Sequence, residues 1–121
     1  MLQAALITFG VDDSAVERLQ ALVRDRGVTV RITRDPKACL NLLRQGVVGV
    51  LLFRVGANLE TEFTLLSKVA QQFPQVAPIV WGRSDHPRLG GLAWDLGARC
   101  VLLGPTDQNR LDDAILHLLP G

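Results

Sequence analysis

The feature of this 121-residue sequence that most limits its fold is a strict alternation of apolar, strand-like runs with helix-like segments. The runs predicted as β-strands are short, apolar and bounded by turn residues. They cover residues 4–9, 28–33, 47–53, 78–81 and 100–103. A helical pattern follows each run, as at Val16, Leu19 and Val23, and the fourth helix is predicted over about residues 87–96. Strands that alternate with helices predict an α/β protein with a parallel sheet.

The predicted strands are apolar on both faces, so helices are expected to cover the sheet from both sides. Crossovers between parallel strands are right-handed, which leaves few topologies. We predict one domain over residues 1–121, a three-layer α/β/α sandwich of the flavodoxin-like type. Its five-stranded parallel sheet has the order 2-1-3-4-5, with helices one and five on one face and helices two, three and four on the other. Ligands of such folds bind beyond the carboxyl ends of the strands.

Composition excludes several classes of function. The formal net charge of +1 gives little attraction to nucleic acid, so we expect no direct nucleic-acid binding. The longest apolar runs, such as residues 47–53, are far shorter than the roughly 20 residues that cross a bilayer, so we expect no membrane contact. No secretion signal is visible, and a cytoplasmic location is expected. Cys39 and Cys100 lack metal-ligand spacing and are predicted to be buried apolar residues.

Short segments at characteristic mutual spacing resemble the receiver (CheY-like) domain of bacterial two-component response regulators. They are residues 38–44, Phe73-Pro74, Leu96-Gly97-Ala98 and Gly104-Pro105. The resemblance covers nearly the whole chain. Receiver domains phosphorylate an aspartate after the third strand. They also use an acidic pair after the first strand, a hydroxyl after the fourth and a lysine after the fifth. The resemblance therefore implies the receiver fold and a role in signal transduction.

At these positions the chain departs from the family's pattern. The matching residues are Gly10 and Val11 for the acidic pair, Arg54 for the phospho-acceptor, Gly82 for the hydroxyl and Gly104 for the lysine. The family's proline is retained as Pro105, and the aromatic switch position is Val101. A guanidinium stays protonated, cannot accept a phosphoryl group by this chemistry and repels a divalent cation. The scaffold is thus expected to be kept and the reaction lost.

A slip of two residues in the first strand would instead make Asp12 and Asp13 the acidic pair. The unslipped register is favoured because it keeps Leu19 and Val23 on the core face of the following helix. Two carboxylates near Arg54 are expected to form an ion pair with it and to cap that helix. Two interpretations of Arg54 stay open: it mimics a bound cation by neutralising these aspartates, which would lock one state, or it is simply a solvated residue at a strand end. We expect no metal and no cofactor.

The segment Arg83-Ser84-Asp85-His86 combines a hydroxyl, an acid and an imidazole. A hydrolytic triad needs its base oriented by the acid and its nucleophile within hydrogen-bond reach of the base, which neighbours on one loop seldom achieve. We therefore interpret the segment as a loop that leads into a helix. No other constellation supports catalysis, so the protein is not expected to be an enzyme.

The predicted fourth helix contains Gly90 and Gly91, which cost on the order of 2 kcal/mol of helix stability relative to alanine. Trp94 on this soft helix either packs into the core or belongs to a partner-binding face. The charged residues near that face are Arg99, Arg110, Asp112 and Asp113. They are predicted to form reciprocal pairs in a weak homodimer through helix four, strand five and helix five.

The sequence thus predicts a phosphorylation-independent pseudo-receiver, a signalling module that acts through a protein partner or an output domain. The alternative is a small anionic-ligand-binding domain, in which Arg54 and Arg83 face an anion in the crevice at the carboxyl ends of the strands. Whether an output domain follows Gly121 remains open at this point.

Overall fold

The computed structural model describes residues 3–83, 88–104 and 108–120. Strands and helices alternate as predicted. The elements are β1 (Gln3–Phe9), α1 (Asp13–Val23), the 3-10 helix η1 (Arg24–Arg26), β2 (Thr29–Thr33), α2 (Pro36–Arg44), β3 (Val47–Val55), α3 (Leu59–Gln72), β4 (Val76–Gly82), α4 (Leu89–Asp95), β5 (Cys100–Leu103) and α5 (Gln108–Leu118).

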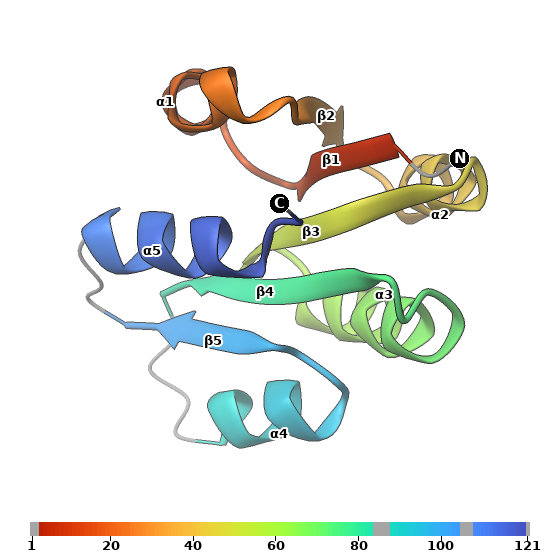
Figure 1. Cartoon of the computed structure of the whole chain (residues 1–121). Coiled ribbons are helices and arrows are strands. Elements are labelled where there is room, and N and C mark those ends of the chain that lie inside the picture. Colours follow the sequence, from red (N-terminus) through yellow and green to blue (C-terminus); the bar gives the residue numbers. More distant parts are fainter. Residues whose placement is uncertain (1–2, 84–87, 105–107, 121) are drawn as a thin grey trace.

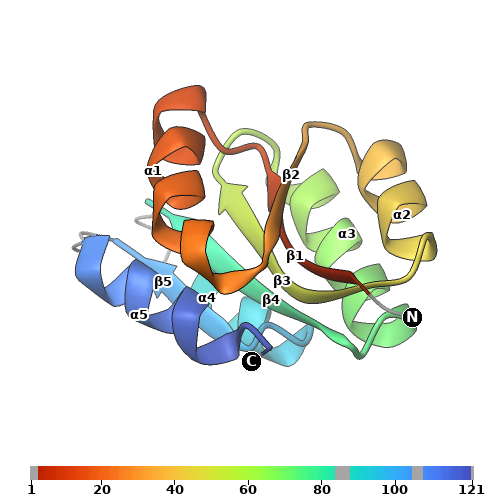
Figure 2. The ribbon, with the colours of Figure 1, turned by 45° about the horizontal axis from the view of Figure 1, so that its top comes forward.

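The strands form one parallel sheet in the predicted order β2-β1-β3-β4-β5 (Figure 1). The central strand, β3, pairs with β1 on one side and with β4 on the other, and this register places Arg54 opposite Trp81. Helices α1 and α5 cover one face of the sheet, and α2, α3 and α4 cover the other (Figures 1 and 2). This three-layer arrangement confirms the predicted fold class.

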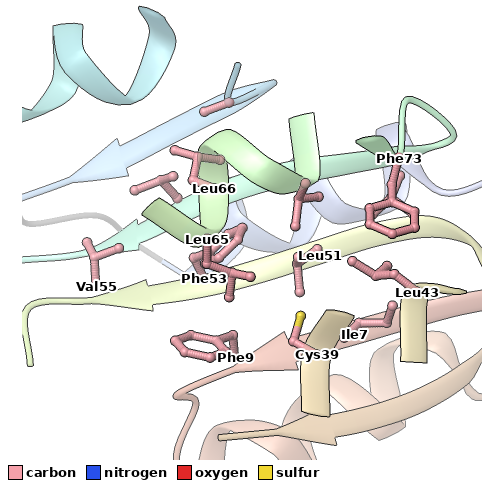
Figure 3. Packing of buried hydrophobic residues seen from close by; sticks show 14 of the residues in the cluster. Ile7, Phe9, Cys39, Leu43, Leu51, Phe53, Val55, Leu65, Leu66 and Phe73 are labelled. Carbon is pink, nitrogen blue, oxygen red and sulfur yellow. The ribbon is translucent and has the colours of Figure 1, made fainter. Parts of the chain in front are cut away.

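Two apolar cores lie on the two faces of the sheet, and alternate residues of β3 enter each. Leu51 and Phe53 join the core beneath α2, α3 and α4, whereas Val50 and Leu52 join the core beneath α1 and α5. Successive side chains of a strand point to opposite faces, so a strand covered on both sides must be apolar throughout. In the first core, the rings of Phe9 and Phe53 lie 5.8 Å apart (Figure 3).

The two cysteines differ in burial. Cys39 is fully buried in the first core, as predicted (Figure 3). Cys100 is only partly buried, so the prediction of a buried thiol is wrong for this residue. The reason is its place in β5, which lies at the edge of the sheet and pairs with β4 alone.

The ends of several elements differ from the sequence prediction: β1 begins at Gln3, β2 begins at Thr29, and β3 continues to Val55. Strand β4 begins at Val76, two residues before the predicted start, because Val76 and Ala77 already pair with β3. Helix α4 spans seven residues and is shorter than the predicted 87–96, of which residue 87 lies outside the described part. The longest helix in the described ranges, α3, has 14 residues, and none there is long and apolar enough to cross a membrane.

Helix α4 generates a prediction about stability. Gly91 lies within this helix, and a Cβ added there would meet no atom within 4 Å. Gly91→Ala should therefore raise the free energy of unfolding by roughly 0.5–1 kcal/mol, because alanine loses less backbone entropy in a helix. Chemical denaturation monitored by circular dichroism measures the change.

Gly97→Ala is the matched control. Gly97 follows α4 with a φ of +111°, and an added Cβ would lie 2.3 Å from the Cβ of Ala70. This substitution should lower stability, because both the backbone angle and the contact are unfavourable for alanine. If Gly91→Ala lowered stability as well, residue 91 would not lie in a regular, open turn of helix.

Candidate functional site

The carboxyl ends of the strands form a crevice that Arg54 divides into two hollows. One hollow, of about 460 Å³, lies beside the start of α1 and is also lined by Asp12, Arg18, Trp81 and Gln108; we call it the α1 hollow. The other, of about 430 Å³, lies beside the β3–α3 loop; we call it the α3 hollow. The crevice is where open parallel sheets bind ligands.

The guanidinium of Arg54 lies over the ring of Trp81, with 4.3 Å between its central carbon and the ring centroid. The parallel register of β3 and β4 brings these two side chains together at neighbouring strand ends. A cation in this position is attracted by the negative face of the aromatic ring. Arg54 is half-buried and therefore held, which differs from the freely solvated residue that the sequence suggested.

The predicted ion pair between Arg54 and the aspartates after β1 is wrong. Asp13 instead pairs with Arg34, whose Nη2 lies 2.8 Å from Oδ1 of Asp13, in an exposed pair of small energetic worth. Asp12 does occupy the N-cap position of α1, but its side chain accepts no capping hydrogen bond and lines the α1 hollow. The strand register fixes Trp81 alongside Arg54, whereas Asp12 and Asp13 lie at the start of α1 after β1.

Glycines occupy the ends of β1, β4 and β5 at the crevice. The φ angles of Gly10, Gly82 and Gly104 are +73°, +154° and +96°, which side chains rarely adopt. Gly82 is the tightest of the three, since an added Cβ would lie 2.6 Å from the carbonyl oxygen of Val55. A hydroxyl-bearing residue therefore does not fit at position 82 without a shift of β4 away from β3.

Glu62 is a site residue that the sequence did not reveal. Its carboxylate is buried at 4% exposure. One oxygen accepts a hydrogen bond from the N–H of Gly56 at 2.9 Å, and the other accepts one from the N–H of Asn58 at 3.4 Å. A carboxylate of the protein itself thus fixes the β3–α3 loop and occupies the inner wall of the α3 hollow.

Arg18 is a second residue that sequence reasoning missed. Its Nη1 lies 2.5 Å from Oδ1 of Asp112, which ties α1 to α5. Its Nη2 is buried and has no hydrogen-bond partner among the described residues. This pair corrects the prediction that Asp112 lies on an exposed surface: its side chain is only 23% exposed and already engaged.

The remaining predicted surface residues lie largely where expected. Trp94 is 53% exposed, so the alternative that packs it into the core is wrong. Arg99, Arg110 and Asp113 are exposed as well. Arg83 is exposed and does not line either hollow, whereas Ser84, Asp85, His86 and Pro105 lie outside the described residues.

Metal-ligating residue types and the two thiols are the groups of the described part that bear on reactive chemistry. Within residues 3–83, 88–104 and 108–120, no three His, Cys, Asp or Glu side chains come together as a metal site would require. Burial raises the pKa of Cys39 to about 11 and also raises the pKa of Cys100. Both thiols are therefore protonated at neutral pH, and a thiol is a much weaker nucleophile than a thiolate.

No protein-family model and no curated protein matches the sequence. Solved structures do match. The signal receiver domain of an HD domain-containing protein from Pseudomonas fluorescens Pf-5 has a TM-score of 0.78 at 22% identity, with 97% of this chain and 87% of that chain covered. The receiver domain of the Francisella response regulator 1452 has a TM-score of 0.75 at 14% identity, with 94% of each chain covered.

A third similar structure is RcsB from Salmonella enterica serovar Typhimurium, bound to promoter rprA in the presence of the phosphomimetic BeF3⁻. Its TM-score is 0.73 at 19% identity, and the match covers 94% of this chain but 67% of that one. Identities this low establish the fold alone. The chain has the CheY-like fold of response-regulator receiver domains.

Proposed function

We propose that this protein is a pseudo-receiver, a signalling module with a receiver scaffold that works without phosphorylation. The observation that carries the proposal is the stacking of Arg54 on Trp81 at the strand end where a receiver domain carries its phospho-acceptor. A guanidinium offers no nucleophilic oxygen, and its contact with the ring holds a positive charge where a receiver binds its divalent cation.

The glycines at the crevice support the same proposal. In the proposed correspondence with receiver domains, Gly82 occupies the position of the hydroxyl residue and Gly104 that of the lysine. Gly10 and Val11 occupy the positions of the acidic pair. Val11 is buried and cannot serve as a ligand, and Gly82 is held too close to Val55 for a side chain. At position 82, the close approach of the backbone thus disfavours a side chain as well, which supports the proposal that the hydroxyl group is lost.

The first functional prediction is that acetyl phosphate and Mg²⁺ leave the protein unphosphorylated. Arg54 supplies no acyl oxygen, and Gly104 supplies no cation to stabilise the transferred phosphoryl group. Intact-protein mass spectrometry measures the outcome, with a receiver domain that carries the usual aspartate as the positive control. Arg54→Asp should remain unphosphorylated too, because positions 82 and 104 still lack their groups. A base-labile gain of one phosphoryl group in the wild type would contradict the proposal.

The proposed module acts through protein contacts, either with a separate partner or with an output domain of the same polypeptide. RcsB, whose structure is bound to a promoter, is longer than this chain and matches it over 67% of its own length. We assign the contact to the face of α4, β5 and α5, where Trp94, Arg99, Arg110 and Asp113 are exposed. Aromatic and arginine side chains are enriched at protein interfaces.

The homodimer that the sequence predicts across this face would lack one of its expected charged contacts between copies. Asp112 was expected to form a reciprocal pair with a second copy, but Arg18 of the same chain already holds it. We therefore propose that the α4–β5–α5 face contacts a different protein or an output domain, and not a second copy of this chain.

The α1 hollow supports a second candidate function, the binding of a small anion. Arg18 and Arg54 both line this hollow, and Arg18 has a buried Nη2 that lacks a partner among the described residues. A buried donor without an acceptor costs about 1–3 kcal/mol, which a bound oxygen atom would recover. The pair of arginines differs from the sequence hypothesis, in which Arg83 accompanied Arg54.

This candidate predicts that inorganic phosphate raises the melting temperature in a saturable manner at constant ionic strength. A ligand that binds only the native state stabilises it by about 2.7 kcal/mol at 100 times its Kd. Arg54→Gln should abolish the rise, whereas Arg31→Gln, an exposed residue of β2, should leave it unchanged. A rise that survives Arg54→Gln, or no rise in the wild type, would remove anion binding in this hollow and leave the pseudo-receiver proposal intact.

A further inference from the structure

Helices α3 and α4 lie on the face of the sheet opposite to α1 and α5 (Figure 1). Residues of both helices line a groove between them. It has a volume of about 620 Å³, and its apolar wall consists of Leu59, Phe63, Leu89, Leu92 and Leu96. Leu59 and Leu92 are 36% and 44% exposed, so they are two of the few large apolar side chains that the described surface leaves open to water. Contiguous exposed apolar surface of this kind often marks a binding site.

Two charged residues of α3, eight positions apart in the sequence, line this groove. Glu60 and Lys68 both line it and are both exposed, and Thr64 lies midway between them in the sequence. Eight residues of α-helix separate the two charges by about 12 Å along the axis, too far for them to pair within one chain. In residues 3–83, 88–104 and 108–120, no ion pair involves either residue.

The spacing of Glu60, Thr64 and Lys68 along α3 makes this row of side chains complementary to the same row in a second copy. Glu60, Thr64 and Lys68 are four residues apart, and such a row forms one of the ridges through which helices pack on each other. A two-fold axis through Thr64 exchanges the two ends of the ridge. Glu60 of one copy then faces Lys68 of the other, and the reverse pair forms at the same time, as in any isologous interface.

We propose that the α3–α4 groove binds a second copy of this chain. In the symmetric arrangement, the apolar walls of the two grooves cover each other, while both charges of each α3 gain a partner of opposite sign. Apolar burial provides most of the attraction, and the charges fix the antiparallel orientation. This self-association goes beyond the proposed signalling role and leaves the α4–β5–α5 face, with Trp94, available to another protein.

Charge reversal gives a direct test of this dimer. Two single variants should each dimerise poorly when alone, but should associate with each other when mixed. Glu60→Lys places two lysines on the ridge, and Lys68→Glu places two glutamates there. Each variant alone should weaken the homodimer by at least about 10-fold in Kd, since attraction becomes repulsion at two symmetric contacts. An equimolar mixture should associate again, because every lysine then faces a glutamate. The double variant Glu60→Lys/Lys68→Glu should associate like the wild type.

Sedimentation velocity at low ionic strength, over concentrations up to about 1 mM, measures each species and the mixture. Circular dichroism of each variant confirms that α3 remains folded. Arg110→Glu, on the α4–β5–α5 face, is the matched control and should leave association unchanged. A wild type that stays monomeric, a dimer that neither single variant weakens, or a mixture that fails to associate would each overturn the proposal. If Arg110→Glu lost the dimer while the two single α3 variants kept it, the contact would lie on the α4–β5–α5 face. That result would also overturn the proposal.

Discussion

The parallel pairing of β3 between β1 and β4 is the constraint on which the rest of the molecule depends. It buries β3 on both faces, so its side chains must supply both cores at once. The same pairing aligns the ends of three strands at one edge of the sheet. Arg54 meets Trp81 there because the register leaves it opposite that residue. The position of the Arg54 positive charge in the crevice therefore follows from the backbone pairing of β3 with β4.

Much of the fold could be predicted because it depends on periodicity. The apolar runs of β1 and β3, and the helical spacing of Val16, Leu19 and Val23, report burial directly. The start of α2 also depends on local chemistry: Asp35 accepts a hydrogen bond from the N–H of Ala38, and Pro36 stands in the first turn. Strand ends were harder, because the pairing of Val76 with β3 depends on a strand distant in sequence.

The candidate site was harder to predict because its contacts are tertiary. Arg54 was located from the sequence, but its partner was not, since only the register of two adjacent strands identifies Trp81. Glu62 resembles an ordinary acidic residue in the first turn of a helix. Its carboxylate reaches back to the loop from one position beyond the usual capping box, so no familiar pattern marks it. The pairing of Arg18 with Asp112 joins residues 94 positions apart.

The buried carboxylate of Glu62 has a consequence for how this crevice could evolve. In the β3–α3 loop, the N–H groups of Gly56 and Asn58 already donate to an acceptor that the chain carries with it. An aspartate at position 54 would add a second negative charge to the hollow that Glu62 lines, where like charges repel. Under the proposed function, an aspartate at position 54 would have to be accommodated near Glu62, and replacing Glu62 would remove the hydrogen bonds that shape the loop. The shape of this loop thus depends on a residue whose negative charge disfavours a further carboxylate nearby.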